Sequence, residues 1–469
     1  MKNQKRQETA YLTGCLLLYL LPALVLGSRL YNDSDQYIVM HIHREPLYPL
    51  WLLFFRSVLP EAICYRAAGL VQCVLNALAT YVLALRLKRL FSLDGVRRAL
   101  IILLAFLPQA LTYFGSSSRM YMAGDILSES LAYPLFLITM MLLIETAVGE
   151  GGNVLRQRVT WEALAASLLL SLLRGQMIVL GIVWFLTVCL RLLRERSHGL
   201  TKNTVPALRG ILVSALCVAL FLAGRNLFVR TYFYVLGEGF DSHSIAMSNV
   251  ISHVLYVSEE EDAAAVPDSE PFFEKPDDTL RDYFLRMCDK MDTMRMNLSY
   301  EEGSLYARNS YMESCRDPIA YDIAWRTIYE AVDVHGYDYN TEDAMANEVN
   351  GALVRALMPV VFPRWIGVYA RHVTQGIIRS VGITHPVLSW LFLVLFAAAV
   401  GMTLNALLKK TGQEKRYALA TVPLLLFLLG NACAVALLQF CIQRYMFYAF
   451  PLFYILYGNW IYERLKGAI

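Results

Sequence analysis

The chain has 469 residues, of which 57% are hydrophobic and only 17% are charged, and its mean hydropathy is +0.43. This composition excludes an ordinary soluble domain. The net charge of +3 says little about partners, because the basic residues occur in short loops rather than on one basic face with interleaved aromatics. That distribution argues against a nucleic-acid-binding protein.

Apolar windows long enough to cross a bilayer, which requires about 20 residues per helix, recur along the chain. The first window lacks a small-residue cleavage site, so we expect a retained helix rather than a secretory signal. The sequence predicts an all-α polytopic membrane protein with about ten spanning segments, at 11–28, 64–86, 98–114, 126–148, 160–173, 176–193, 206–228, 385–408, 417–438 and 443–462. The fifth and sixth are separated only by Arg174 and Gly175, which predicts a tight hairpin.

Lysine and arginine are concentrated in alternate loops between these segments, and the positive-inside rule places such loops in the cytoplasm. Both termini are then cytoplasmic, and five segments lie outside: 29–63, 115–125, 174–175, 229–384 and 439–442. The predicted organisation is an N-terminal transmembrane module at 1–228, an external region at 229–384 and C-terminal transmembrane helices at 385–469.

The external region at 229–384 holds 25 of the 39 acidic residues but only 13 of the 42 basic ones, which agrees with this orientation. Its apolar residues are spaced three and four apart, so we expect it to be mostly helical. The clearest example has apolar side chains at Leu280, Tyr283, Phe284, Met287, Met291 and Met294. Cys288 and Cys315 lie in this region and could form a disulfide if it faces an oxidising compartment.

Polar and titratable side chains gather on the predicted outer face, although charges near a membrane are costly and usually face a cavity or each other. They are Asp33, Asp35, His41, His43, Arg44 and Glu45 in the first external loop, Arg119, Asp125, Ser128 and Glu129 around the second, and Arg174, Arg225 and Arg444 at helix ends. Their convergence on one face is more informative than any single residue.

Each of these residues alone has a plain structural alternative. Asp33 could cap a short helix, and Glu129 could sit at a helix N-terminus, where the dipole favours an acid. Arg444 could be an interfacial anchor. The spacing of His41 and His43 suits metal ligation on a strand, but solvated histidines in a surface loop are at least twice as common.

Together, acids and arginines at a membrane surface predict a specific chemistry. A carboxylate can act as general base toward a hydroxyl acceptor, and arginines can bind a phosphate in a bidentate manner. A phosphate beside an apolar bundle implies a lipid phosphate, and hence transfer of a group from a lipid-linked carrier. No Walker A, dinucleotide-binding or HExxH sequence occurs in the cytoplasmic loops, so ATP-driven transport and zinc proteolysis have no support.

Four short motifs in this order resemble GT-C fold membrane glycosyltransferases, especially bacterial relatives of protein O-mannosyltransferases and the lipid A aminoarabinose transferase. They are "DSDQY" followed by "REPLYPL" in the first external loop, "ILSESLAYPLF" at the fourth span, "LLRGQ" at the hairpin and the terminal "RYMFYAFPL". The resemblance covers most of the membrane portion and implies a GT-C-type bundle. It says nothing about 229–384.

The resemblance implies a polyprenyl-phosphate-linked sugar as donor and an inverting displacement in which an acid of the first external loop is the base. We expect that role for Asp35, with Asp33 as the second candidate and Glu129 orienting the acceptor or an arginine. The expected donor-phosphate ligands are Arg174 and Arg444, followed by Arg44 and Arg119. The residues expected to line the donor or acceptor pocket are Tyr37, His43, Tyr48 and Tyr445.

Gln36 replaces the second acid usual in that family, so the prediction includes no metal ligand; a divalent metal is compatible with such an enzyme but unsupported. No tightly bound cofactor is expected. The predicted setting is the bacterial plasma membrane, in contact with membrane lipids, with a glycolipid, polymer or protein as acceptor and no nucleic acid. Two alternatives stay open: an envelope polysaccharide polymerase or ligase that uses lipid diphosphates, and a transporter or flippase.

Overall fold

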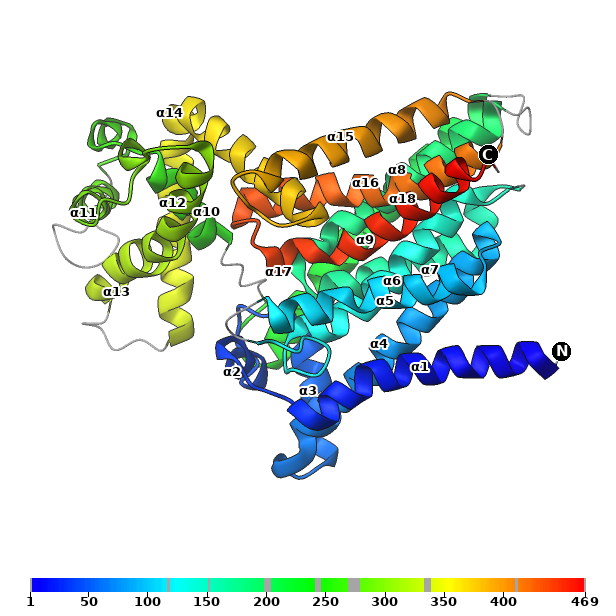
Figure 1. The fold of residues 1–469 in the computed structure, drawn as a ribbon. Coiled ribbons are helices and arrows are strands. Elements are labelled where there is room, and N and C mark those ends of the chain that lie inside the picture. The colour runs from blue at the N-terminus through cyan, green and yellow to red at the C-terminus, as the bar shows by residue number, and fades with distance from the viewer. Residues whose placement is uncertain are drawn as a thin grey trace.

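The computed structural model describes residues 2–115, 119–150, 152–197, 204–240, 246–268, 279–332, 339–409 and 412–467, which form helices and no strands (Figure 1). The helices of the N-terminal half are α1 Lys2–Leu26, α2 Asn32–Ile38, α3 Leu47–Val58, α4 Glu61–Phe91, α5 Gly95–Phe114, α6 Ser128–Val148, α7 Arg158–Leu173, α8 Val179–Ser197 and α9 Thr204–Val235. Those that follow are α10 Ala246–Tyr256, α11 Leu280–Thr293, α12 Leu305–Asp317, α13 Arg326–Val332, α14 Tyr339–Val381, α15 Leu388–Leu407, α16 Gln413–Leu438, α17 Gln443–Met446 and α18 Phe450–Leu465.

Shorter helical turns fill several connections between these helices. They are η1 Val154–Arg156, η2 Gly175–Ile178, η3 Glu260–Ala265, η4 Leu298–Tyr300, η5 Pro318–Trp325 and η7 Phe447–Ala449. Of these, η5 is a π-helix and continues directly into α13. The η2 turn joins α7 to α8, as the predicted tight hairpin requires.

Nine helices in the described part of the chain are long and apolar enough to cross a membrane, so this is an all-helical protein of the multi-pass membrane type. Eight of the nine overlap predicted spans: α1, α4, α5, α6, α8, α9, α15 and α16. The other two predicted spans correspond to α7 and α18, which have 16 residues each and fall short of that length.

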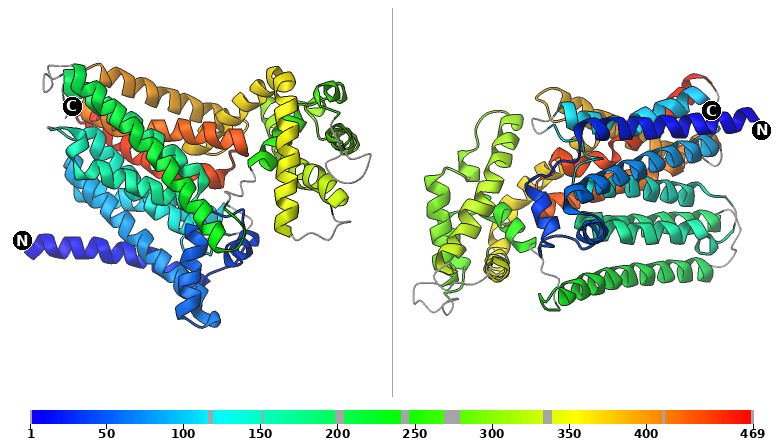
Figure 2. Two further views of the ribbon diagram at one scale, coloured as in Figure 1. Left: turned by 180° about the vertical axis from the view of Figure 1, so that it is seen from behind. Right: turned by 90° about the horizontal axis from the view of Figure 1, so that it is seen from below.

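The ninth long apolar helix is α14, which the sequence prediction placed wholly in the external region. Its 43 residues include Glu342–Val381, which has the length and hydropathy of a span. The helix nevertheless lies at a steep angle to the helices of the bundle (Figures 1 and 2). It packs against α10, α11 and α13 of the external region. Its side chains Leu353, Leu357 and Val368 lie in the core of that region, and Val381 reaches the core of the bundle. Thus α14 connects the two parts.

The bundle and the external region have separate hydrophobic cores. The bundle core includes Trp184, Trp460 and Phe136, all fully buried. The external core, formed by α10–α14, includes the fully buried Tyr283 and Phe284. Association of helices within lipid depends on close packing rather than on removal of apolar surface from water, whereas burial of each large apolar side chain in the external core contributes about 1.5–3 kcal/mol.

Helix α11 tests the predicted periodicity within the external region. Leu280, Tyr283, Phe284, Met287 and Met291 are buried as predicted, and Met294, just beyond the helix end, is 42% exposed. All nine cysteines are free, so Cys288 and Cys315 are not joined in a disulfide.

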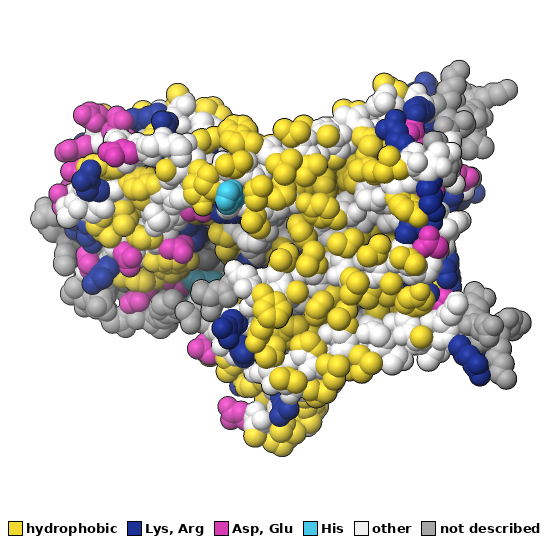
Figure 3. Space-filling view, viewed as in Figure 1, with side chains coloured by type: hydrophobic (Ala, Val, Ile, Leu, Met, Phe, Trp, Pro, Cys, Tyr) yellow, Lys and Arg dark blue, Asp and Glu magenta, His cyan; other side chains and the backbone are white. Residues whose placement is uncertain are grey.

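One end of the bundle faces the external region, and the first turns of α1 and the last turns of α18 lie at the opposite end (Figure 1). Apolar side chains cover the exposed face of the bundle between two ends where charged side chains gather (Figure 3). Helices α2, α3 and α17 all lie at the end near the external region (Figures 1 and 2). The candidate site is built there.

Candidate functional site

The first element of the site is the short helix α2, which carries Asp33. Ser34 fixes its start, because the Tyr31 amide donates to Ser34 Oγ at 2.8 Å and this hydroxyl donates to the Ile126 carbonyl at 2.7 Å. Asp125 reinforces the junction by accepting from the Arg29 amide at 3.2 Å and from the Tyr31 hydroxyl at 2.9 Å. The segment before α6 therefore positions α2.

Asp33 bridges two arginines that come from opposite ends of the sequence. Its Oδ1 accepts from Arg44 Nη2 at 2.7 Å, and its Oδ2 accepts from Arg444 Nη2 at 2.6 Å. Burial alone would raise the pKa of Asp33, but the guanidinium groups of Arg44 and Arg444 more than offset this, so its pKa lies below the ordinary value. Asp33 is therefore ionised, with both oxygens occupied.

Glu129 continues the same chain of contacts. Its Oε1 lies 2.7 Å from Arg174 Nη1 and 2.7 Å from Arg444 Nε. Glu129 occupies the first turn of α6, where the helix dipole favours an acid. Its side chain is fully buried, and Arg174 is only 9% exposed. Arg444 thus connects the two carboxylates.

These five side chains, Arg44, Asp33, Arg444, Glu129 and Arg174, are called the arginine cluster below. Three guanidinium groups share two carboxylates, so the cluster carries one surplus positive charge. Buried charges are stable only when they are compensated. Arg44, Asp33 and Arg444 keep 21%, 26% and 26% of their side chains exposed, so this part of the cluster is accessible to solvent.

Neutral side chains hold the arginines in place. Ser128 Oγ lies 2.9 Å from the Tyr37 hydroxyl and accepts from Arg174 Nη1 at 3.2 Å. Gln36 Oε1 accepts from Arg44 Nε at 2.7 Å. Gln36 is thus a hydrogen-bond acceptor for Arg44. It occupies the position at which the family that the sequence resembles usually has a second acid.

The hairpin that carries Arg174 places Gly175 close to a side chain of the loop before α3. A Cβ at Gly175 would lie 2.7 Å from Glu45 Oε1, which is too close for a real contact. Glu45 is paired there with Arg225 of α9. This neutral pair therefore packs against the hairpin backbone and fixes the direction from which Arg174 enters the cluster.

Aromatic rings border the cluster on two sides. The guanidinium carbon of Arg174 lies 5.2 Å from the centroid of Tyr445 and 6.0 Å from that of Tyr448, and Arg44 lies 4.8 Å from that of Tyr37. Tyr37 and Tyr48 meet edge to face at 4.9 Å. Such rings stabilise cations that have lost part of their hydration.

The structure brings together most, but not all, of the residues predicted to form the site. Asp35, the expected base, is exposed, and within the described residues its side chain makes no hydrogen bond or ion pair. Arg119 is also exposed, and its carbonyl accepts a hydrogen bond from Arg29 Nη1 at 3.2 Å. His43 lies outside the arginine cluster, close to Asp343. Tyr48 is fully buried, and its hydroxyl accepts from Gln72 at 3.1 Å.

Several residues at the site were not among the predicted site residues. Ser128 is the hub of the neutral contacts, Gln36 holds Arg44, and Tyr448 lies fully buried beside Arg174. Ser128 was already noted in the sequence beside Glu129, but without a role at the site. The role of Tyr448 depends on how α17 and η7 fold back, which no short pattern indicates.

Comparison with protein-family models, with curated proteins and with solved structures finds no match. The geometry of the site is therefore the basis for assigning a function.

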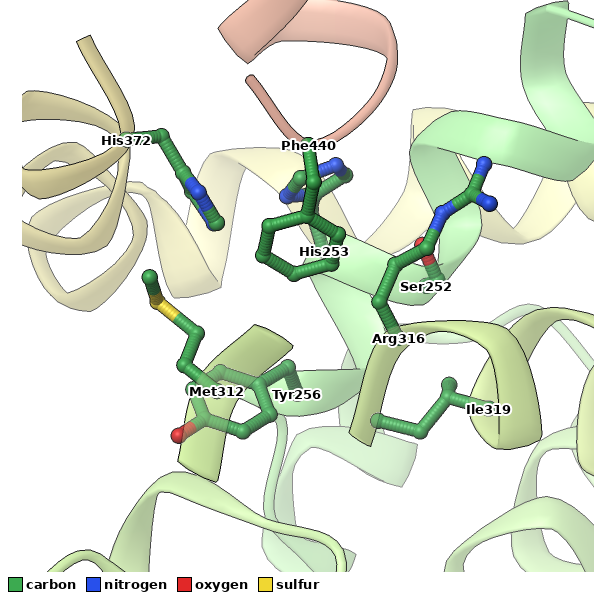
Figure 4. A pocket seen from close by; sticks show the side chains of 8 residues that line it. All are labelled: Ser252, His253, Tyr256, Met312, Arg316, Ile319, His372 and Phe440. Atoms are coloured by element: carbon green, nitrogen blue, oxygen red, sulfur yellow. The ribbon is translucent and has the colours of Figure 1, made fainter. Parts of the chain in front are cut away.

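Two cavities lie elsewhere in the described part of the chain, and neither resembles the arginine cluster. One of about 10 Å³ has room for about one water and is bordered by His253, His372 and Phe440 (Figure 4). Burial lowers the pKa of His253 to about 3, so that imidazole is neutral at physiological pH. The other, an apolar pocket of about 220 Å³ between α12, α14 and the start of α15, includes Trp390 and Leu393. Neither cavity includes a residue of the arginine cluster.

Proposed function

We propose that this protein is a GT-C-type membrane glycosyltransferase that transfers a sugar from a polyprenyl-phosphate-linked donor to a cell-envelope acceptor. The observation that carries the proposal is the arginine cluster, in which three arginines and two carboxylates meet at one end of an apolar helix bundle. At the surface of a membrane, the anion available to this cluster would be the phosphate of a lipid-linked carrier.

The charge of the cluster supports a monophosphate donor. A sugar linked to a lipid through one phosphate is a phosphodiester with a single negative charge, and the cluster has a single surplus positive charge. A lipid diphosphate would bring two negative charges and leave one uncompensated. Arg225, the next arginine of the bundle, is already paired with Glu45 and adds no surplus.

The proposed reaction is an inverting displacement. The acceptor hydroxyl oxygen forms a bond to the anomeric carbon while the bond from that carbon to the phosphate oxygen breaks. The hydroxyl proton passes to a carboxylate, and the bonding electron pair leaves with the polyprenyl phosphate, whose charge changes from −1 to −2. Arg44, Arg174 and Arg444 would stabilise the charge that develops on the leaving group more than that of the ground state, which is what lowers a barrier.

We assign the base role to Asp33 rather than to Asp35. Asp33 lies within the arginine cluster, whereas Asp35 is exposed two residues along the same helix. Without a ligand, Arg44 and Arg444 keep the pKa of Asp33 low. A donor phosphate would draw these guanidinium groups away, and burial would then raise the pKa of Asp33 and make it a better base. Base activation would thus be coupled to donor binding.

The acceptor and the cellular setting follow from the same proposal. A glycolipid, polymer or protein on the outer face of a bacterial plasma membrane would approach from the side of the external region. The basic loops and the acidic composition of 229–384 support this orientation, with both termini in the cytoplasm. Tyr37 and Tyr445, next to the arginines, are the proposed walls of the donor pocket.

A paired substitution tests the proposal. The full chain is reconstituted in liposomes with a panel of polyprenyl-phosphate hexoses and pentoses, and release of polyprenyl phosphate is measured with envelope extract as acceptor. We expect Asp33→Asn to lose at least about 100-fold in turnover, and Asp35→Asn, a matched change on the same helix, to stay within about threefold. Equal turnover of Asp33→Asn and wild type would overturn the assignment of the base.

Two other outcomes would redirect the proposal. Turnover of lipid-diphosphate donors alone would indicate an envelope polymerase or ligase. Movement of labelled lipid across the liposome membrane without a glycosidic product would indicate a flippase.

A further inference from the structure

A second polar group, separate from the arginine cluster, joins the first external loop to the external region. His41 and His43 lie between α2 and α3, and Asp343 lies in the first turns of α14. His43 Nε2 lies 2.9 Å from Asp343 Oδ2, and His41 Nε2 lies 4.0 Å from the same oxygen. The two imidazole rings are 4.5 Å apart at their centroids. Three side chains from two distant parts of the sequence thus place ligand atoms close together.

This group is buried. The side chains of His41, His43 and Asp343 are 9%, 6% and 0% exposed. Asp343 Oδ1 accepts a hydrogen bond from the Tyr329 hydroxyl, which leaves Oδ2 facing the two imidazoles. Within the described ranges, no lysine or arginine forms an ion pair with Asp343. A buried carboxylate without a fixed cation is costly, so the site favours a positive charge beside Oδ2.

We propose that His41, His43 and Asp343 bind a divalent transition-metal ion of the zinc type. Two imidazole nitrogens and one carboxylate oxygen are a donor set that Zn²⁺ prefers, and three protein ligands leave a fourth position for water. Ligands of tetrahedral zinc are separated by roughly 3.3 Å, given bond lengths near 2.0–2.1 Å. The separations of 2.9 and 4.0 Å lie on either side of that value, and the three ligand atoms all lie within 4.8 Å of one another.

The three side chains differ in how far they are already oriented for metal binding. The Tyr329 hydroxyl already orients the Asp343 carboxylate, as partners of metal ligands commonly do. The His43 amide donates to His41 Nδ1 at 3.3 Å. Metal binding at Nε2 of His41 would place the ring proton on Nδ1 and break this contact. His43 and Asp343 are thus the preformed pair, and His41 completes the site by a small adjustment of its ring.

The ion would add a direct link between the first external loop and the external region. It would tie the loop at 41–46 to α14, and Tyr329 would connect it further to α13. Arg44 of the arginine cluster directly follows His43 in that loop. The proposal itself concerns metal binding and interdomain stability, so it stands or falls independently of glycosyl transfer.

Metal content and thermal unfolding test this site. The full chain is purified in detergent without metal-affinity steps, stripped with a chelator and titrated with Zn²⁺ alone. We expect one Zn²⁺ per wild-type chain, a rise in Tm on binding, and at least tenfold weaker binding in His43→Gln and in His41→Gln. His385→Gln, which alters an exposed histidine before α15, is the control and should bind zinc as wild type does.

A cobalt spectrum guards against a folding defect. Co²⁺ in a site of two imidazoles and one carboxylate gives visible d–d absorption, which should appear with wild type and His385→Gln and be lost in His43→Gln of equal monodispersity. If wild type binds no more zinc than His43→Gln, or if zinc leaves its Tm unchanged, the site holds an adventitious ion only and the proposal is overturned.

Discussion

Two arginines of α14, Arg371 and Arg379, are paired differently from the arginines of the arginine cluster. Arg371 contacts both oxygens of Glu301, at 2.8 and 2.6 Å, and Arg379 contacts both oxygens of Glu313, at 2.5 and 2.8 Å. Each is a closed, neutral, bidentate pair. In the cluster, Arg444 instead divides its contacts between Asp33 and Glu129. A closed pair has no capacity left for a ligand, whereas the cluster has both a surplus charge and guanidinium groups that can exchange partners.

This difference separates structural from functional charge. Removing one side of a closed pair should reduce stability and leave the chemistry of the remaining folded protein intact. Removing a cluster arginine should reduce anion binding and turnover before it reduces stability. The four predictions below test that distinction, from the largest expected effect to the smallest.

Substitution of Arg444 should have the largest effect, because it contacts both carboxylates. We expect Arg444→Gln to lower turnover of a polyprenyl-phosphate sugar by about 100- to 1,000-fold, as loss of a transition-state charge ligand does. The matched change Arg371→Gln should lower Tm while its folded fraction keeps turnover close to that of wild type. Similar losses of turnover in both variants, measured per folded molecule, would show that the two kinds of pairing are equivalent.

Substitution of Glu129 tests the buried side of the cluster. Glu129→Ala leaves Arg174 with no carboxylate partner in the described structure, which should cost about 3–5 kcal/mol of stability. Thermal unfolding in detergent measures this. We further expect added inorganic phosphate to restore part of the lost Tm, because an anion can replace the missing carboxylate. Wild-type stability without phosphate would mean that Glu129 does not balance the arginines.

Asp125 predicts a pH dependence of stability. Burial raises the pKa of Asp125 to about 6, although contacts with Tyr31 and Arg29 oppose the shift. The folded state thus keeps a proton on this group at a pH where the unfolded chain, with its ordinary pKa near 3.8, has lost it. Stability from this group is fully present below about pH 3.8 and is lost as pH rises to about 6, by about 3 kcal/mol at most. Asp125→Asn, which mimics the protonated form, should unfold at a higher Tm than wild type at pH 7, and the difference should shrink as the pH falls toward about 3.8. A variant less stable than wild type at pH 7 would contradict this sign.

Gly175 should give the smallest effect. The Cβ of Gly175→Ala would meet Glu45 Oε1 at 2.7 Å, but Glu45 is a flexible side chain that can yield. We expect a loss of about 1 kcal/mol in stability and a several-fold rise in KM for the donor with little change in kcat, because Arg174 shifts. Gly401→Ala, at a glycine of α15 with no neighbour within 4 Å and no positive φ, is the steric control. An unchanged KM would remove Gly175 from the account of how Arg174 is placed.

Local patterns predicted much of the fold. Leu280, Tyr283 and Phe284 were identified as core from their spacing, because one helix face determines their burial. The hairpin at Arg174 followed from two residues between two apolar runs. The length of α14 was not predicted, because its hydropathy resembles that of a span while its packing partners belong to the external region.

The sequence named the five residues of the arginine cluster, but it did not predict which of them contact one another. Asp33 and Asp35 look alike in sequence, and only the orientation of α2 relative to Arg444, more than 400 residues away, distinguishes them. Asp343 could not be identified from the sequence as a partner of His41 and His43, because it lies far along the chain in α14 and no short pattern relates that helix to the first external loop. Contacts between distant elements decided both cases.

Direct binding of the proposed product anion tests the central claim. A short-chain polyprenyl phosphate is titrated into the full-length protein in detergent by calorimetry, in parallel with Arg444→Gln and Arg371→Gln. The account predicts saturable binding that weakens at least tenfold in Arg444→Gln and stays unchanged in Arg371→Gln. Equal affinity in all three proteins would contradict the claim that the arginine cluster is a phosphate site.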